Sequence, residues 1–257
     1  MSHSHESDHQ AAENEPRPID CIVVLGRGIE LTPHTHQWRP TRAIERLKEP
    51  GEHSGAREEG LAPNSDGKIV IAGANANVTA CVELFEELAG AGKRPKLVIF
   101  AAGRPGYLED HPDEALSEGK ILSQKFLART NGFGPAETAV LDNAKYTKDD
   151  IVGSMRLAHE HGLNKLAVIT IGLHIDRSRE FLQQAYAENP ELREIEAEFF
   201  ASEELLLKRY EYNSARLERF MRGLNELKAS KAWALTAARE RNGVEALLAG
   251  NYRPPES

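Results

Sequence analysis

The stretch KLAVITIGLHIDR, residues 165–177, decides the fold of this chain. It opens with an apolar, β-branched run that has no polar alternation, which is typical of a strand buried on both faces of a parallel sheet. A glycine, a histidine and an arginine follow, where such a strand gives way to a helix. In open α/β sheets, ligands bind beyond the carboxyl ends of the strands. The stretch therefore predicts both a parallel sheet and the edge at which a functional site lies.

Similar runs recur along the chain, and segments with helical periodicity separate them. The candidate strands cover residues 21–26, 68–73, 96–103, 138–142, 165–172 and 195–200. Strands that alternate with helices build right-handed βαβ units. We therefore expect a Rossmann-like, doubly wound α/β fold, with a mainly parallel sheet, helices on both faces and a C-terminal helical appendage.

Composition divides the chain into three parts. Residues 1–17 are polar and histidine-rich, which is typical of a disordered tail. Residues 18–201 form the expected α/β domain, in which the Gly- and Pro-rich segment 48–67 is read as a surface loop. Residues 202–257 are expected to form a charged helical extension, which either packs on the sheet domain or binds a protein partner.

Charge and hydropathy exclude several classes of protein. The 257 residues carry 32 Lys+Arg against 40 Asp+Glu, a net charge of −8, and this acidic balance disfavours nucleic-acid binding. The longest apolar run, residues 97–102, is far shorter than the roughly 20 residues of a membrane-spanning helix. The polar head lacks the apolar region of a secretory signal. Together with Cys21 and Cys81, read as buried thiols, these features predict a cytoplasmic protein.

Glycines and polar side chains follow the candidate strands. Glycine permits close approach of the backbone to a ligand, and free N–H groups at a helix start suit an anion. The GxG at residues 26–28 lacks the third glycine of a dinucleotide fingerprint, so a simple tight turn remains its alternative interpretation. The candidate ligand-binding residues of this kind are Gly26, Arg27, Gly28, Gly73, Asn75, Gly103 and Arg104.

Two further candidates follow the fourth run. Asp142, at the end of that run, is interpreted as a carboxylate for hydroxyl binding or acid–base chemistry. Thr147 and Asp150 have the spacing of a capping box, in which a hydroxyl and a carboxylate satisfy the N–H groups of a helix start. Both also lie where a ligand would bind.

The strongest local signal for chemistry is the group Thr170, His174 and Arg177. An imidazole beside a guanidinium can combine a base with an anion clamp. Asp176 is interpreted as the cap of the following helix, and a structural hydrogen-bonding role for His174 remains the alternative. No metal site is expected, because His34 and His36 have no matching Cys or paired carboxylates.

The order of these motifs resembles the YdcF/SanA/ElyC family, the bacterial domain of unknown function 218. The resemblance covers about residues 20–187 and rests on the following segments: Val24-Leu25-Gly26, Ala101-Ala102-Gly103, Ser117-Glu118, Asp142 to Asp150, and Thr170, His174 and Arg177. Two departures stand out: the family's SGG is Ala101-Ala102-Gly103, and its usual Glu and Ser are Asp142 and Ala144. The resemblance implies a Rossmann-like fold, with S-adenosylmethionine or a nucleotide-like ligand in some members and links to the cell envelope in others.

Three functions are consistent with this pattern. The first is binding of a small anionic or adenosyl ligand, with Ser117, Glu118, Thr147 and Asp150 among the binding residues. The second is a transferase or hydrolase that acts on this ligand with His174 as base. The third is a non-catalytic scaffold that binds a partner through its C-terminal helices.

Overall fold

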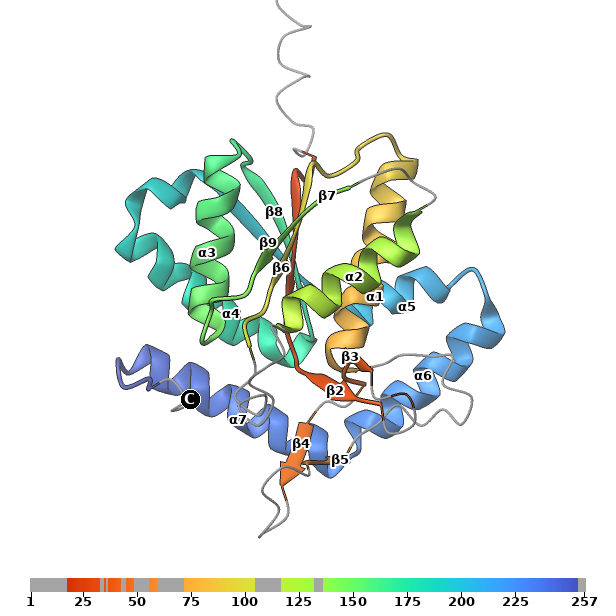
Figure 1. The fold of residues 1–257 in the computed structure, drawn as a ribbon. Helices are drawn as coiled ribbons and strands as arrows, with labels where there is room; N and C mark the ends of the chain where they lie inside the picture. The colour runs from red at the N-terminus through yellow and green to blue at the C-terminus, as the bar shows by residue number, and fades with distance from the viewer. Residues whose placement is uncertain are drawn as a thin grey trace, which may run out of the picture.

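The computed structural model describes residues 18–32, 35, 37–42, 45–48, 56–59, 72–104, 117–131 and 136–253. The polar tail at 1–17 and the candidate strand at 68–71 lie outside these residues. Figure 1 shows the sheet in the middle of the molecule, with helices on both of its faces.

Five strands form one sheet in which all neighbours are parallel. In chain order they are β1 (Cys21–Leu25), β6 (Leu97–Ala101), β7 (Glu137–Leu141), β8 (Lys165–Thr170) and β9 (Glu196–Ala201). Their spatial order is β7-β6-β1-β8-β9, so the chain winds outward from β1 to one edge and then returns to β8. The expected doubly wound sheet is confirmed, and its strand order reverses between β1 and β8, where such folds form their ligand crevice.

The sheet is covered on both sides. In β1, Ile22 and Val24 face one buried cluster, whereas Cys21, Val23 and Leu25 face the other. All five side chains are at most 1% exposed, which explains why the run shows no polar alternation. Cys21 and Cys81 are both buried free thiols, as expected.

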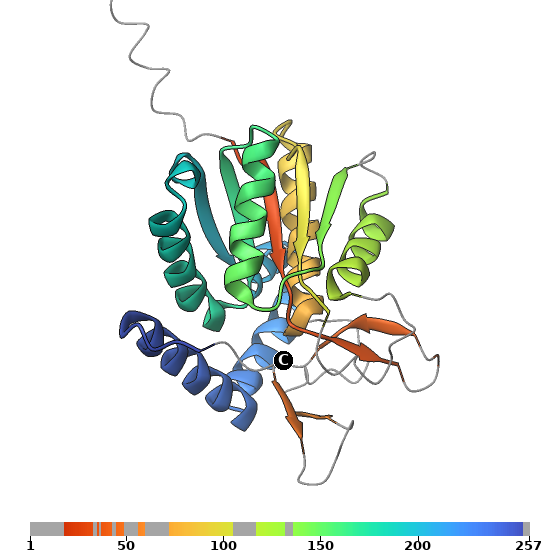
Figure 2. The ribbon, with the colours of Figure 1, turned by 60° about the vertical axis from the view of Figure 1, so that its left-hand side comes forward.

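Seven helices surround the sheet in the described part of the chain. They are α1 (Gly73–Gly90), α2 (Glu118–Thr130), α3 (Thr147–Glu160), α4 (Gly172–Glu188), α5 (Ser202–Tyr210), α6 (Ser214–Lys228) and α7 (Lys231–Leu248), with a short 3₁₀ helix at Pro190–Glu194. The last three confirm the C-terminal helices, and they do not stand apart: α5 packs on α1, and α7 packs on α4. Figure 2 shows α7 beneath the end of the sheet toward which the strand arrows point. Across the described ranges, no helix combines the length and apolarity needed to cross a membrane.

Two small antiparallel hairpins lie between β1 and α1. One pairs β2 (Ile29–Leu31) with β3 (Trp38–Pro40), and the other pairs β4 (Glu45–Lys48) with β5 (Ala56–Glu59). The expectation of a plain loop at 48–67 is therefore wrong for residue 48 and for residues 56–59. A Gly- and Pro-rich composition predicts turns, but it does not exclude a short strand that pairs with an earlier part of the chain.

Candidate functional site

A pocket of about 460 Å³ opens at the carboxyl edge of the sheet. Its wall combines the loops after β1, β6 and β7, the starts of α2 and α3, one residue of α4 and one face of α7. The residues that line it are Gly26, Arg27, Gly28, Ala102, Gly103, Arg104, Glu118, Ala144, Lys145, Tyr146, Thr147, Asp150, Arg177, Thr236, Arg239 and Glu240. Nine of the fifteen residues expected to form a ligand site are thus brought together.

The loop at residues 26–28 is held by a carboxylate of the protein itself. Glu118 Oε1 accepts hydrogen bonds from the backbone N–H groups of Arg27 (2.5 Å) and Gly28 (2.7 Å). Gly26 is required for this contact, because a Cβ there would lie 2.6 Å from Glu118 Oε2. Ser117 fixes the start of α2, since its hydroxyl accepts a hydrogen bond from the Lys120 N–H. The anion-binding donors expected in this loop are therefore already occupied by Glu118.

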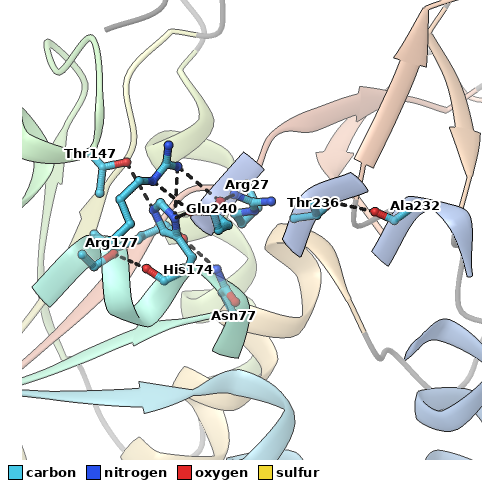
Figure 3. Close-up of polar contacts among 10 residues, drawn as sticks. Arg27, Asn77, Thr147, His174, Arg177, Ala232, Thr236 and Glu240 are labelled. Atoms are coloured by element: carbon cyan, nitrogen blue, oxygen red, sulfur yellow. Dashed lines mark hydrogen bonds and ion pairs between the residues drawn. The ribbon is translucent and has the colours of Figure 1, made fainter. Parts of the chain in front are cut away.

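His174 lies in the first turn of α4 and is only 3% exposed. Its Nδ1 atom is 2.9 Å from Glu240 Oε2, and its Nε2 atom is 3.2 Å from Thr147 Oγ1. Figure 3 shows the imidazole between these two side chains, which come from α7 and α3. The ring therefore joins α4 to α3, the preceding helix in the sequence, and to the distant α7.

Burial and the neighbouring charges determine the protonation states of Glu240 and His174. Burial alone would raise the pKa of Glu240, but the hydrogen bond from His174 and the charges of His174, Arg177 and Arg27 outweigh it and lower that pKa. Arg177 Nε lies 2.8 Å from Glu240 Oε2, and Arg27 Nη1 lies 3.5 Å from Glu240 Oε1. Burial lowers the pKa of His174, and although Glu240 opposes this, the charges of Arg27 and Arg177 add to it.

The tautomer of His174 follows from the ionised state of Glu240 and the neutral state of the imidazole. An ionised carboxylate can only accept a hydrogen bond, so His174 carries its proton on Nδ1 and donates it to Glu240. The neutral Nε2 atom then accepts the hydroxyl proton of Thr147. A carboxylate, an imidazole and a hydroxyl are thus arranged in series, and Thr147, which carries the hydroxyl, lines the pocket.

Asp150 is the second group whose protonation is altered. Burial, with additional repulsion from Glu118 and Asp149, raises its pKa to about 8. Its Oδ1 atom is buried, and no described residue gives it a hydrogen bond. At neutral pH the pocket therefore contains a protonated, uncharged carboxyl group on the same helix as Thr147.

Two expectations about helix caps are wrong. Helix α3 begins at Thr147 itself, its cap position is Tyr146, and the Thr147 hydroxyl contacts His174 instead of the helix backbone. Asp149, not Asp150, accepts a hydrogen bond from a backbone N–H just before the helix, that of Lys145.

The second cap concerns α4. Asp176 does not cap this helix, because α4 begins four residues earlier, at Gly172, and the Asp176 side chain is 82% exposed and paired with Arg179. The Gly172 N–H instead donates to Glu203 of α5 at 2.9 Å. A tertiary contact takes the place of the local cap that the sequence indicated.

Several predicted site residues lie outside the pocket wall. Asp142 is on the surface, where its carboxylate pairs with Lys120 at 3.2 Å. Thr170 and Ser117 are both buried, and neither lines the pocket. Gly73 and Asn75 begin α1, where the Asn75 N–H donates to the Thr41 carbonyl. Asn77 then donates to the carbonyl of Leu25, which places the start of α1 at the carboxyl end of β1.

Helix α7 contributes to the site without having been predicted from the sequence. Thr236, Arg239 and Glu240 all line the pocket, more than 60 residues after His174. These three residues and Gly243 are spaced three or four apart, so they share one polar face of the helix. This polar face is the sequence pattern from which a contribution of α7 to the site could have been predicted. Gly243 permits close packing on α4, because a Cβ there would lie 2.8 Å from Arg177 Cδ. The apolar stripe of the C-terminal helices is a stronger sequence pattern than this polar face, but it indicates only that the helices pack on the rest of the protein.

No protein-family model matches the chain, and neither a curated protein nor a solved structure is significantly similar to it. The resemblance to the YdcF/SanA/ElyC family therefore stays a prediction that rests on the sequence motifs alone. Evidence on function comes from the geometry and the charge of the pocket.

Proposed function

We propose that the pocket binds a small, compact anionic ligand. The observation that carries this proposal is the charge of the wall. Five cationic side chains line it: Arg27, Arg104, Lys145, Arg177 and Arg239. They face the carboxylates of Glu118 and Glu240, while Asp150 is neutral below a pKa of about 8. Among the described residues, the wall thus carries an excess of three positive charges, in a protein whose net charge is −8.

A compact anion fits this wall better than an adenosyl or nucleotide-like ligand. Dinucleotide-binding sheets offer a carboxylate to the ribose and a glycine-rich loop with free N–H groups to the phosphates. Here β6 ends at Ala101 and is followed by Ala102, so this strand end offers no carboxylate. The N–H groups of Arg27 and Gly28 are taken by Glu118. The remaining cationic side chains suit a phosphate or carboxylate group.

Calorimetric titration of the full chain with inorganic phosphate tests the proposal. We expect binding that weakens with salt. Replacing Arg239 by Gln should lower the affinity about 10- to 150-fold, the usual range for one charge-assisted hydrogen bond. Arg219→Gln, at an exposed position of α6 outside the pocket, is the matched control. Equal affinities in both variants, or no binding of phosphate or adenosine monophosphate at millimolar concentration, would contradict the proposal.

A transferase or hydrolase that acts on the bound ligand is the second candidate. It is favoured by the unprotonated Nε2 atom of His174, which its contact with Glu240 holds in place. A scaffold that binds a partner through its C-terminal helices is less well supported, because α7 directs Thr236, Arg239 and Glu240 into the pocket.

A further inference from the structure

The side chains around His174 are arranged for more than binding. Thr147 lines the pocket, whereas the His174 ring, only 3% exposed, lies behind it and is not part of the wall. A ligand in the pocket therefore meets Thr147 before it meets the imidazole. The imidazole can act on that ligand only through this hydroxyl, with which it shares a 3.2 Å contact.

We propose that Thr147 is the nucleophile of a phosphate-ester hydrolase, that His174 is its base, and that Glu240 positions the imidazole. The inference rests on the proposed binding of a compact anion in this pocket. Nucleophile, base and orienting carboxylate in series are the arrangement by which hydroxyl nucleophiles are activated in proteins. The substrate class follows from the cationic wall, because arginine and lysine side chains stabilise the charge on the oxygens of a transferring phosphoryl group.

The reaction balances with the groups present and one water molecule. In the first step the Thr147 Oγ–P bond forms and the ester P–O bond breaks, while the hydroxyl proton moves to His174 Nε2. The departing alkoxide leaves with the electron pair of the broken bond and takes a proton from a water molecule in the pocket, which becomes hydroxide, while His174 keeps the proton of Thr147. In the second step this hydroxide attacks the phosphothreonine. Inorganic phosphate leaves, and the proton on His174 returns to the Thr147 oxygen.

The surroundings suit each role. Thr147 is the first residue of α3, so the partial positive charge of the helix start lies beside the oxygen that becomes negative. The charged groups that face the imidazole are Glu240 from α7, Arg177 from α4 and Arg27 from the loop after β1, as Figure 3 shows. Two guanidinium groups beside the ring disfavour a second proton on it, and Glu240 balances them once the ring becomes charged. The ring is thus a free base before the reaction and a stabilised cation during it.

The alternative role for the same contacts is structural, since they tie α3, α4 and α7 together. Substitution by valine keeps the shape of threonine and removes only its hydroxyl, so it separates the two roles. The matched control is Thr130→Val in α2, because this buried hydroxyl donates to the carbonyl of Phe126 in its own helix.

The experiment uses the purified full chain with p-nitrophenyl phosphate as the probe. Release of nitrophenolate reports turnover, and acid quenching followed by peptide mass spectrometry reports a phosphoryl group on Thr147. We expect turnover and a trapped phosphoryl group in the natural chain and in Thr130→Val. Thr147→Val should lose both, Thr147→Ser should restore turnover, and His174→Gln should reduce turnover at least about 100-fold.

Glu240 is tested by the pH dependence of turnover in Glu240→Gln. Removal of its charge leaves Arg27 and Arg177 unopposed beside the ring. We therefore expect the acid limb of the profile to move to lower pH while the maximal rate falls. A purely structural role would reduce the amount of folded protein without moving that limb.

The outcomes separate this inference from the proposed function. If phosphate binds in calorimetry but p-nitrophenyl phosphate is neither turned over nor leaves a phosphoryl group on Thr147, the pocket is a binding site and the inference is overturned. Undiminished turnover in Thr147→Val would also overturn it, because the water would then be activated without the hydroxyl. If phosphate does not bind, the proposed function fails as well.

Discussion

Replacement of Asp150 by asparagine is expected to stabilise the protein, by an amount that grows with pH. Asp150 ordinarily has a pKa of 3.8, but burial and the nearby Glu118 and Asp149 raise it to about 8 in the folded chain. The folded state therefore holds a proton that the unfolded state has released. A pKa that is raised by folding gives its full stability below the unfolded value and loses it as pH rises through the folded value.

The magnitude at pH 7 follows from the distance to the unfolded pKa. Each unit corresponds to about 1.36 kcal/mol, so keeping Asp150 protonated between pH 3.8 and pH 7 costs roughly 4 kcal/mol of unfolding free energy. Asparagine has nearly the same shape and no charge in either state, so it removes this cost. We expect the gain of Asp150→Asn to be near zero at pH 4, to rise by about 1.4 kcal/mol per pH unit, and to level off above pH 8.

Urea denaturation followed by circular dichroism, at one-unit steps from pH 4 to pH 9, measures this difference. Asp176→Asn serves as the control, because its side chain is 82% exposed and replacement there should change stability by less than about 0.5 kcal/mol at any pH. A pH-independent difference, or a loss of stability at pH 7 in Asp150→Asn, would show that Asp150 is ionised in the folded protein. That result would also remove one positive charge from the proposed excess in the pocket.

Three further changes probe the packing behind the site, each measured as a change in unfolding free energy at pH 7. Gly26→Ala should destabilise the protein by about 1–3 kcal/mol, because the new Cβ would lie 2.6 Å from Glu118 Oε2. Gly90→Ala is the control and should not destabilise the protein, because a Cβ there meets nothing within 4 Å. Equal losses of stability in the two variants would show that the contact with Glu118 is not the cause. Ser117→Ala should cost about 1 kcal/mol through loss of the cap of α2, and an unchanged stability would show that Glu118 alone fixes this turn. Gly243→Val should separate α7 from Arg177 and cost about 1–3 kcal/mol, whereas Ala234→Val at an exposed position of α7 should be nearly neutral. If both valines cost the same, the close packing of α7 on α4 is not what stabilises this contact.

The strands were predictable because burial on both faces leaves a strong signal in the sequence. The run at residues 21–25 has no polar residue, and the structure buries both of its faces. The shared edge of the strand ends follows from the parallel pairing, so Gly26, Gly103 and Arg177 were found from the sequence alone. The candidate strand at 68–71 lies outside the described residues and stays a prediction.

The remainder of the site could not be predicted, because it depends on contacts between distant segments. The partner of His174 is Glu240, 66 residues later, and no local pattern connects them. The caps failed for the same reason. Thr147 and Asp176 have the sequence of helix caps, but the Thr147 hydroxyl is engaged by His174, and Glu203 of α5 takes the N–H of Gly172. Local hydrogen-bonding patterns are weak predictors where a tertiary partner competes for the same group.

The surroundings of the pocket hold two of its titratable groups, Asp150 and His174, in the uncharged form. Asp150 keeps its proton at pH 7 because burial and two carboxylates oppose its ionisation, and His174 lacks a second proton because burial and two guanidinium groups oppose it. Because Asp150 is uncharged, it does not offset the arginines of the wall. Paired groups whose environments drive them to opposite proton affinities are typical of sites that transfer protons. Because the guanidinium groups of Arg27 and Arg177 are held by Glu240 of α7, this electrostatic arrangement exists only when the C-terminal helix is packed against the sheet domain.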